Sequence, residues 1–334
     1  MSEKQLKSRH GTRYSFSVVL TTFFLSLSGT FQLGFQDIFY EHYNKAFNPE
    51  INEEMYYFPT EEKMVHDTNA TRGFNTTTIK PKNFENFSPR VSHTLLYFHL
   101  GAAIGSLLFG SIFLKLGAKW SFLLFSGLGI LTSPLIALGE IIQDHFLLLL
   151  IIRSFYGICI GFLTCLQIFV LNDIAFDEDR NVFNFFIILG LPLGAFAGLF
   201  AGYEPFTDAE IWYGGHLFSI FPLLISFIFG LLFFRDSLST LILKGNDEKA
   251  IKSAKHYYGD FRAGFALAET YDRIKIRPSV PTAITIWSDK IALKALFLSV
   301  LVNFVAGFSG DRFSWIFLYR YLTATNEKVG LVKL

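Results

Sequence analysis

Long apolar segments limit what this chain can fold into. Six apolar stretches of roughly twenty residues precede a polar segment of about 55 residues, and a seventh apolar stretch follows it. Only a helix of about 20 apolar residues satisfies its own backbone hydrogen bonds inside a bilayer core. The sequence therefore predicts an all-α polytopic membrane protein. We place its spans at residues 14–39, 93–114, 120–140, 146–172, 181–202, 213–234 and 293–320.

The composition supports this fold class and argues against several functions. At 334 residues, with 51% hydrophobic residues and 40 Phe, the chain is too apolar for an ordinary soluble domain. A net charge of +1 gives no surface for nucleic acid. The sequence holds no CxxC pair, HExxH or GxxxxGK[ST] motif, and no cluster of nucleophile and base stands out. We therefore expect neither an enzyme nor a metal or cofactor site.

The distribution of Lys and Arg predicts the orientation. These residues precede the first span, fill the loop at 115–119 and crowd residues 235–290, whereas the loops at 141–145 and 203–211 have none. Cytoplasmic loops carry an excess of Lys and Arg, so we expect a cytosolic N-terminus. The 40–92 loop then faces the exterior or lumen, where glycosylation occurs. Its three N-x-S/T sequons start at Asn69, Asn75 and Asn86. This predicts a multi-pass glycoprotein of the plasma membrane or an endomembrane.

We expect four parts along the chain. Residues 1–13 form a cytosolic N-terminus, and residues 14–234 form a six-helix transmembrane half that includes the exterior loop 40–92. Residues 235–290 form a cytosolic helical connector, and residues 291–334 contain a seventh helix and the start of a second half.

The connector pattern predicts two amphipathic helices. Asn246 is a suitable cap for the first, whose acidic first turn complements the helix dipole. Its apolar stripe is expected at Ile251, Ala254 and Tyr258. The second piece is expected from about Ala263 to Ile276, with Phe265, Ala268 and Tyr271 on one side. The alternative is a partly disordered tether.

Five short motifs follow one another along the chain. Residues 30–36 read TFQLGFQ, residues 105–119 read GSLLFGSIFLKLGAK, and Arg153 is followed by Gly157 and Gly161. Asp173 and Arg180 stand seven residues apart, and residues 235–239 read RDSLS. In order and spacing these motifs resemble those of the sugar-porter branch of the major facilitator superfamily, which includes the facilitative glucose transporters. The resemblance implies a bundle built from two six-helix halves, embedded in lipid, that carries a small uncharged solute such as a hexose.

The chain also departs from the motifs of that branch. Leu114 replaces an acid or amide, and Ala118 replaces an arginine in the loop after the second span. Phe176 and Asn181 replace the Pro and Gly after the fourth span. Ile188 aligns with the glutamine that contacts sugar in the family. These changes remove much of the hydroxyl-binding amide set, whereas the fold does not depend on them.

Uncharged polar residues inside the spans are candidates for lining a solute path. Polar groups in a bilayer core are costly and face a cavity or a partner. The candidates are Gln32, Gln36, Thr164, Gln167, Asn172 and Asn303. The alternative for each is a hydrogen bond to a neighbouring helix. For the intramembrane charge Arg153, a structural role is expected: it pairs with a carboxylate such as Glu140 or Asp144, or snorkels to the headgroups.

Charged residues at the expected cytosolic ends of the helices form a candidate gate. The five residues are Lys115, Lys119, Asp173, Arg180 and Asp236. Opposite charges that meet there latch the gate in one state and part in the other. The alternative is a set of solvated loop charges. Close helix contacts are expected at small residues, namely Gly105, Gly110, Gly157, Gly161, Gly190, Gly194 and Gly198.

Two further features bear on the mechanism. No carboxylate lies in the middle of the first six spans, which favours facilitated diffusion over proton coupling. A complete first half is followed by one helix of a second half, which leaves three interpretations. The chain is a truncated solute carrier, which is the favoured reading; or two copies form a homodimer; or it is a non-transporting receptor, assembly partner or regulatory isoform.

Overall fold

The computed structural model describes residues 16–36, 89–141, 146–176, 179–201 and 218–276, with scattered single positions between 290 and 305. All regular structure in these ranges is helical, which confirms the all-α prediction. The helices are α2 (Phe16–Ser28), α6 (Pro89–Leu116), α7 (Ala118–Ile141), α8 (Phe146–Ile174), α9 (Arg180–Ala201), α11 (Ile220–Leu232), α12 (Leu238–Leu243) and α13 (Asp247–Ile276).

Helices long and apolar enough to cross a membrane coincide with the predicted spans. Five such segments occur in the described part of the chain: Phe16–Gln36, His93–Leu116, Ala118–Ala137, Leu147–Ile174 and Arg180–Ala201. Ile220–Leu232 is a shorter apolar helix inside the predicted sixth span. The predicted seventh span, 293–320, lies outside the continuously described residues. The structure therefore confirms a multi-pass helical protein.

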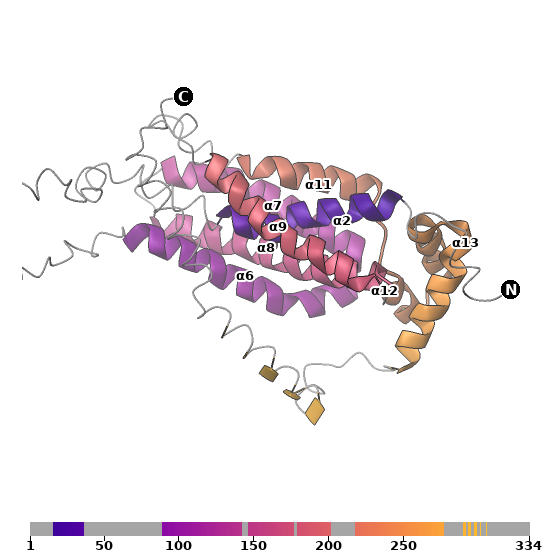
Figure 1. Cartoon of the computed structure of the whole chain (residues 1–334). Coiled ribbons are helices and arrows are strands. Elements are labelled where there is room, and N and C mark those ends of the chain that lie inside the picture. Colours follow the sequence, from indigo (N-terminus) through magenta and orange to yellow (C-terminus); the bar gives the residue numbers. More distant parts are fainter. Residues whose placement is uncertain are drawn as a thin grey trace, which may run out of the picture. The chain divides into compact units, whose positions relative to one another are not determined.

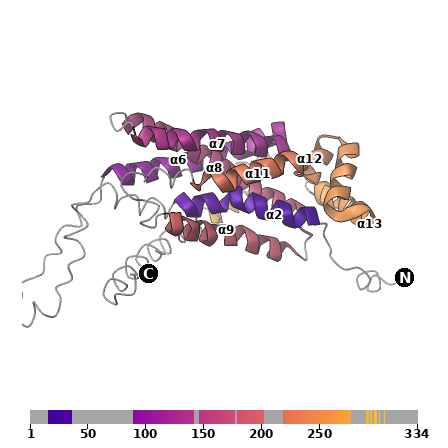
Figure 2. The ribbon, with the colours of Figure 1, turned by 90° about the horizontal axis from the view of Figure 1, so that it is seen from above.

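The six apolar helices lie side by side, and α8 contacts most of the others. It packs against α6, α7, α2 and α9, while α11 packs against α7 and α2. Helix α13 lies at one end of these helices (Figures 1 and 2), which we call the connector end. The bundle and the connector as far as Ile274 belong to one compact unit.

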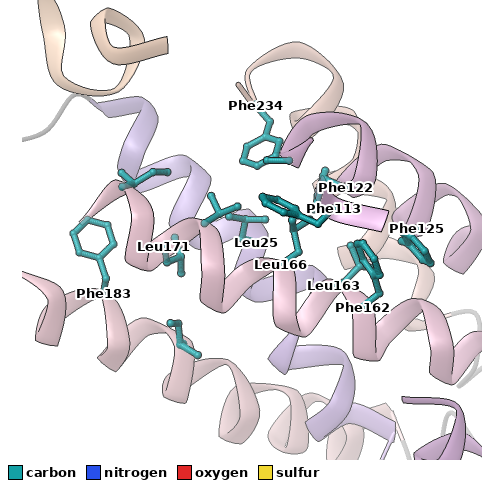
Figure 3. Packing of buried hydrophobic residues seen from close by; sticks show 14 of the residues in the cluster. Leu25, Phe113, Phe122, Phe125, Phe162, Leu163, Leu166, Leu171, Phe183 and Phe234 are labelled. Atoms are coloured by element: carbon teal, nitrogen blue, oxygen red, sulfur yellow. The ribbon is translucent and has the colours of Figure 1, made fainter. Parts of the chain in front are cut away.

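Phenylalanine rings fill the space around α8 (Figure 3). The rings of Phe125 and Phe162 stack with their centroids 3.7 Å apart, and those of Phe122 and Phe234 lie 5.4 Å apart. Phe113 and Phe162 are almost completely buried. Aromatic pairs in these geometries add to the stabilisation from burial. The large number of Phe residues in the sequence thus supplies much of the packing between helices.

Glycines bring α6 and α8 into backbone contact. A Cβ atom at Gly101 would lie 2.0 Å from the Ser154 carbonyl oxygen. A Cβ atom at Gly161 would lie 2.1 Å from the Ala102 carbonyl oxygen. No side chain fits at such distances, so these positions need glycine. Small residues allow membrane helices to approach this closely.

The segment at residues 30–36, which follows α2, packs against α9 in the same way. A Cβ atom at Gly194 would lie 1.9 Å from the Phe31 carbonyl oxygen, and one at Gly34 would lie 2.0 Å from that of Leu191. Gly110, which we predicted as a contact, has open space around its Cβ position. The prediction is therefore wrong at Gly110 within the described residues, none of which, outside the helix itself, comes within 4 Å of its Cβ position.

The connector contains one more helix than predicted. Short helix α12 begins after Ser237, whose side chain accepts a hydrogen bond from the Thr240 N–H as an N-cap. Helix α13 begins at Asp247, as predicted, and its backbone is interrupted at Gly259, where φ is 74°. Because left-handed φ values suit glycine, the two pieces meet there, four residues before the predicted start of the second.

The buried face of α13 differs from the predicted one. Ala254 and Tyr258 are buried as expected, but Ile251 is 44% exposed. In the second piece Phe265 is 68% exposed, and the buried positions are instead Ala263 and Ala266. The exposed Ala268 and Tyr271 were also misassigned. The prediction followed the largest apolar side chains, whereas α13 packs on alanines and on tyrosines whose hydroxyls bond to the bundle.

Candidate functional site

A layer of uncharged polar side chains lies inside the bundle around Gln32. This side chain is fully buried; its Oε1 accepts from the Tyr156 hydroxyl at 3.2 Å, and its Nε2 donates to the Ser219 carbonyl at 3.0 Å. The hydroxyls of Ser219 and Ser133 lie 3.3 Å apart. Four segments meet here: residues 30–36, α7, α8 and the start of α11. We call this group the polar layer.

Arg153 adds a buried charge beside the polar layer. Its side chain is completely buried, and Nη1 donates to Oε1 of Gln36 at 3.0 Å. The guanidinium group therefore does not snorkel to the surface, and this alternative is corrected. The side chains of Glu140 and Asp144, the carboxylates suggested as partners, lie outside the described residues.

Gln167 bonds across an interruption in the first span. Residue 29 is a turn between α2 and a second helical segment at residues 30–36. Oε1 of Gln167 accepts from the Thr30 N–H at 3.0 Å. Its Nε2 lies 3.1 Å from the Ser26 hydroxyl oxygen and 3.3 Å from that of Thr30. No local sequence pattern predicts this interruption, because a single Gly in an apolar helix is common.

Two further path candidates, Thr164 and Asn172, do not join these residues in the described contacts. Thr164 and Asn172 donate to the carbonyls of Ile160 and Ile168, four residues earlier in the same helix. Asn303 lies outside the described residues, as do the sequon residues Asn69, Asn75 and Asn86. Three of the six predicted path residues, all glutamines, therefore lie in the hydrogen-bonded interior.

Sequence reasoning missed Tyr156, Ser133 and Ser219. Spacing along the sequence could have identified Tyr156, because it lies three residues after Arg153 on the buried face of α8. The positions on this face are 153, 156, 160, 163 and 167, and all five are fully buried. Such spacing places residues on one side of a helix. The two serines have no comparable signal, since serines occur throughout the spans.

At the connector end, Asp236 holds the turn between α6 and α7. Gly117, with a φ of 87°, ends α6 in the left-handed conformation common after helices. Oδ1 of Asp236 accepts from the backbone N–H of Lys119 at 2.9 Å. A carboxylate at a helix N-terminus is favoured by the helix dipole. The Lys119 side chain donates to the Leu231 carbonyl at the end of α11, at 3.1 Å.

Asp173 holds the start of α12 against the end of α8. Its carboxylate accepts from the Ser237 hydroxyl at 2.5 Å and from the Ser239 N–H at 3.3 Å. The Ser239 hydroxyl also donates to it. The backbone that follows α11 is therefore fastened to α8 through one acidic side chain.

Of the other two predicted gate residues, Lys115 is linked to the same region. The backbone carbonyl of Lys115 accepts from Nζ of Lys244 at 3.1 Å, which links the end of α6 to the connector. Arg180 is the first residue of α9. The structure thus brings Lys119, Asp236 and Asp173 onto the segment between α11 and α12, and Lys115 is linked to this region through its backbone.

Hydrogen bonds from α13 fasten it to the backbone that follows α11 and to the end of α8. The Tyr257 hydroxyl accepts from the Arg235 N–H at 3.1 Å and donates to the Arg235 carbonyl at 2.9 Å. The Tyr258 hydroxyl donates to the Ile174 carbonyl at 2.6 Å, and Arg273 donates to the Ala175 carbonyl at 3.3 Å. Burial raises the pKa of Tyr257, so it stays a neutral hydroxyl.

Comparisons with known proteins agree with this architecture. The family model described as "Sugar (and other) transporter" matches residues 18–331. The chain is similar to the major facilitator proton:xylose symporter XylE bound to 6-bromo-6-deoxy-D-glucose, with a TM-score of 0.63 and 14% identity over 89% of this chain and 62% of that chain. Comparison with curated proteins gives no match.

Two further structures of XylE from E. coli show the same fold. The partially occluded inward-open form has a TM-score of 0.57 and 16% identity, over 78% of this chain and 58% of that chain. The inward-open form has a TM-score of 0.55 and 14% identity, over 77% and 56%. The chain thus spans about 62% of the length of the first of these solved chains. Because the family model covers nearly the whole sequence, the chain belongs to the sugar (and other) transporter family.

Proposed function

We propose that this protein contributes to the transport of a small uncharged, hydroxyl-rich solute, such as a hexose or a polyol. The observation that carries the proposal is the polar layer around Gln32, in which amide and hydroxyl groups of four segments meet in an apolar bundle. The amide and hydroxyl side chains of this layer can each donate and accept hydrogen bonds. A solute with several hydroxyls pairs with such a set without bringing charge into the membrane.

The mechanism we propose is alternating access. In transporters of this kind one wall of the path rocks against the other about a central site. The described helices form one such wall, and a second six-helix wall, from a further segment or from another copy of the chain, completes the path. The contacts of Asp173 and Asp236 at the connector end then act as the cytosolic latch.

Facilitated diffusion is the proposed mode. Proton relays in membranes use titratable side chains within the spans. In the five long spans of the described part, Asp173 is the one carboxylate, and it lies at the connector end of α8.

Uptake into liposomes tests this function. The purified 334-residue chain is reconstituted and given labelled glucose, xylose or sorbitol, with and without an inward proton gradient. We expect saturable uptake that excess unlabelled solute blocks and that the proton gradient leaves unchanged. The variant Gln32→Leu is expected to reduce uptake at least tenfold. Uptake that requires the proton gradient would overturn the uncoupled mode.

The second candidate is a non-transporting membrane protein, such as a receptor, an assembly partner or a regulatory isoform. Two observations favour it. Ile188 stands where the family has a sugar-contacting glutamine, and its side chain is 69% exposed. The three interior glutamines all bond within the bundle. A reconstituted chain that is folded but neither binds nor moves any of the labelled solutes supports this candidate.

A further inference from the structure

We propose that Gln167 is a positioning residue, which bridges the interruption in the first span and thereby sets the orientation of Gln32 and Gln36. The role of Gln167 in transport rests on the proposed function, whereas the hydrogen bonds of Gln167 do not depend on the solute. It concerns how one side chain on α8 controls a segment of another helix.

The interruption is local, and it leaves the backbone N–H of Thr30 without its usual acceptor in the helix. The Gly29 N–H donates to the Leu25 carbonyl at 3.0 Å, which completes the last regular turn of α2. The Gln32 N–H donates to the Gly29 carbonyl at 3.1 Å, a tighter i to i−3 bond. In a continuous helix the Thr30 N–H would pair with the Ser26 carbonyl. Here it pairs with the side chain of Gln167.

The amide of Gln167 contacts both sides of the interruption. Its oxygen accepts from Thr30 after the break, and its nitrogen reaches the hydroxyls of Ser26 before it and Thr30 after it. The side chain is fully buried. Backbone groups within a bilayer core have no water to pair with, so this substitute acceptor is what makes a break at this depth tolerable.

Neighbouring glycines make room for the bridge. A Cβ atom at Gly29 would lie 2.3 Å from Oε1 of Gln167. A Cβ atom at Gly190 on α9 would lie 2.0 Å from Oγ1 of Thr30. Any side chain at either position would displace the amide or the threonine. The junction of the first span, α8 and α9 is therefore built around this one set of hydrogen bonds.

Three side chains on one face of α8 form hydrogen bonds to residues 30–36, the segment after the interruption. Gln167 fixes its start at Thr30, Tyr156 bonds to Gln32, and Arg153 bonds to Gln36. Loss of the first contact frees the start of the segment to turn about Gly29. We therefore expect the two path glutamines to lose their alignment when Gln167 is replaced.

Hydrogen–deuterium exchange on the reconstituted chain tests the bridge directly. The variants are Gln167→Leu, which removes the amide, and Gln167→Asn, which keeps the amide but shortens its reach by one methylene. Thr164→Val on the same helix is the matched control, because Thr164 bonds only to its own helix in the described contacts. We expect at least tenfold faster exchange in peptides covering residues 26–33 for both Gln167 variants, and no change for Thr164→Val.

Transport kinetics test the positioning role. Misaligned binding groups raise KM, whereas loss of folded protein lowers only the maximal rate. We expect a KM for the labelled solute at least fivefold higher in Gln167→Asn, with a maximal rate per folded molecule within twofold of the parent. Wild-type exchange at residues 26–33 in the Gln167 variants would overturn the bridge. Faster exchange with an unchanged KM would overturn the positioning role. The exchange experiment remains decisive if the proposed transport function itself fails.

Discussion

At the scale of single residues, the bundle depends on positions that hold no side chain. We predict that Gly161→Ala destabilises the protein by about 1–3 kcal/mol, because the new methyl group would lie 2.1 Å from the backbone oxygen of Ala102. Thermal unfolding in detergent measures this change. Gly110→Ala is the control, since the Cβ position of Gly110 is open. Equal effects of the two substitutions would contradict the close approach of α6 and α8.

The interior residues were only partly accessible from the sequence. Rare polar side chains in apolar spans pointed to Gln32, Gln36 and Gln167, and all three are buried. Their partners were not accessible, because spacing along one helix does not tell which neighbouring helix comes close. The Gly29 interruption depends on Gln167, 138 positions later in the printed sequence. A contact of that kind has no local signature.

At the scale of elements, two tyrosines attach α13 to the bundle. We predict that Tyr257→Phe weakens this attachment by about 1–3 kcal/mol, because it leaves both backbone groups of Arg235 without their hydroxyl partner. Amide exchange along α13 measures the change. Tyr271→Phe is the control, because the Tyr271 hydroxyl bonds to Asp247 at an exposed site on the helix itself. Wild-type exchange in Tyr257→Phe would show that the attachment lies elsewhere.

The attachment of α13 is also expected to depend on pH. Burial, with the nearby positive charge of Arg235, lowers the pKa of His256 below 6.5. Above about pH 6.5 the imidazole is neutral in both attached and detached states, so it has no effect. As the pH falls below that value the detached state binds the proton first, and the attachment weakens.

Amide exchange of α13 at pH 7 and pH 5, corrected for the intrinsic rate, measures this effect. The groups near His256 include the cations Arg235 and Lys119, which disfavour a further positive charge, and the Phe233 backbone, whose hydrogen bond favours it. We expect a smaller loss of protection on acidification in His256→Gln than in the parent. The same loss in both proteins would assign the pH dependence to other groups.

The positions of the elements were easier to predict than their faces. Apolar runs located five long spans and the shorter apolar helix α11, and the acidic start of α13 was placed correctly. Helix α12 was missed, because six residues are too few to show a period. The buried face of the second piece of α13 was assigned wrongly, since its Ala263 and Ala266 have less apolar surface than the exposed Phe265. Which face is buried depends on what the bundle presents to it.

At the scale of the whole molecule, the orientation remains a prediction. We expect Asn69, Asn75 and Asn86 to carry glycans, so that glycosidase treatment lowers the apparent mass of the expressed chain towards 38.0 kDa. Each Asn→Gln substitution is expected to remove one step of that shift. Protease added to sealed cells should spare the 235–290 connector and cut it after permeabilisation. Cleavage of the connector in sealed cells would reverse the orientation.

Backbone-to-backbone packing also explains how this architecture survives sequence change. The close approach of a carbonyl oxygen to Gly161 or Gly194 requires only that the residue there has no side chain. The exposed positions of the helices require only an apolar side chain. Such rules leave most positions free to drift over evolutionary time. Most residues can therefore be substituted while the fold is kept, which agrees with the 14% sequence identity to XylE at a TM-score of 0.63. We expect the glycines at these helix contacts to tolerate substitution less than most other positions of the chain.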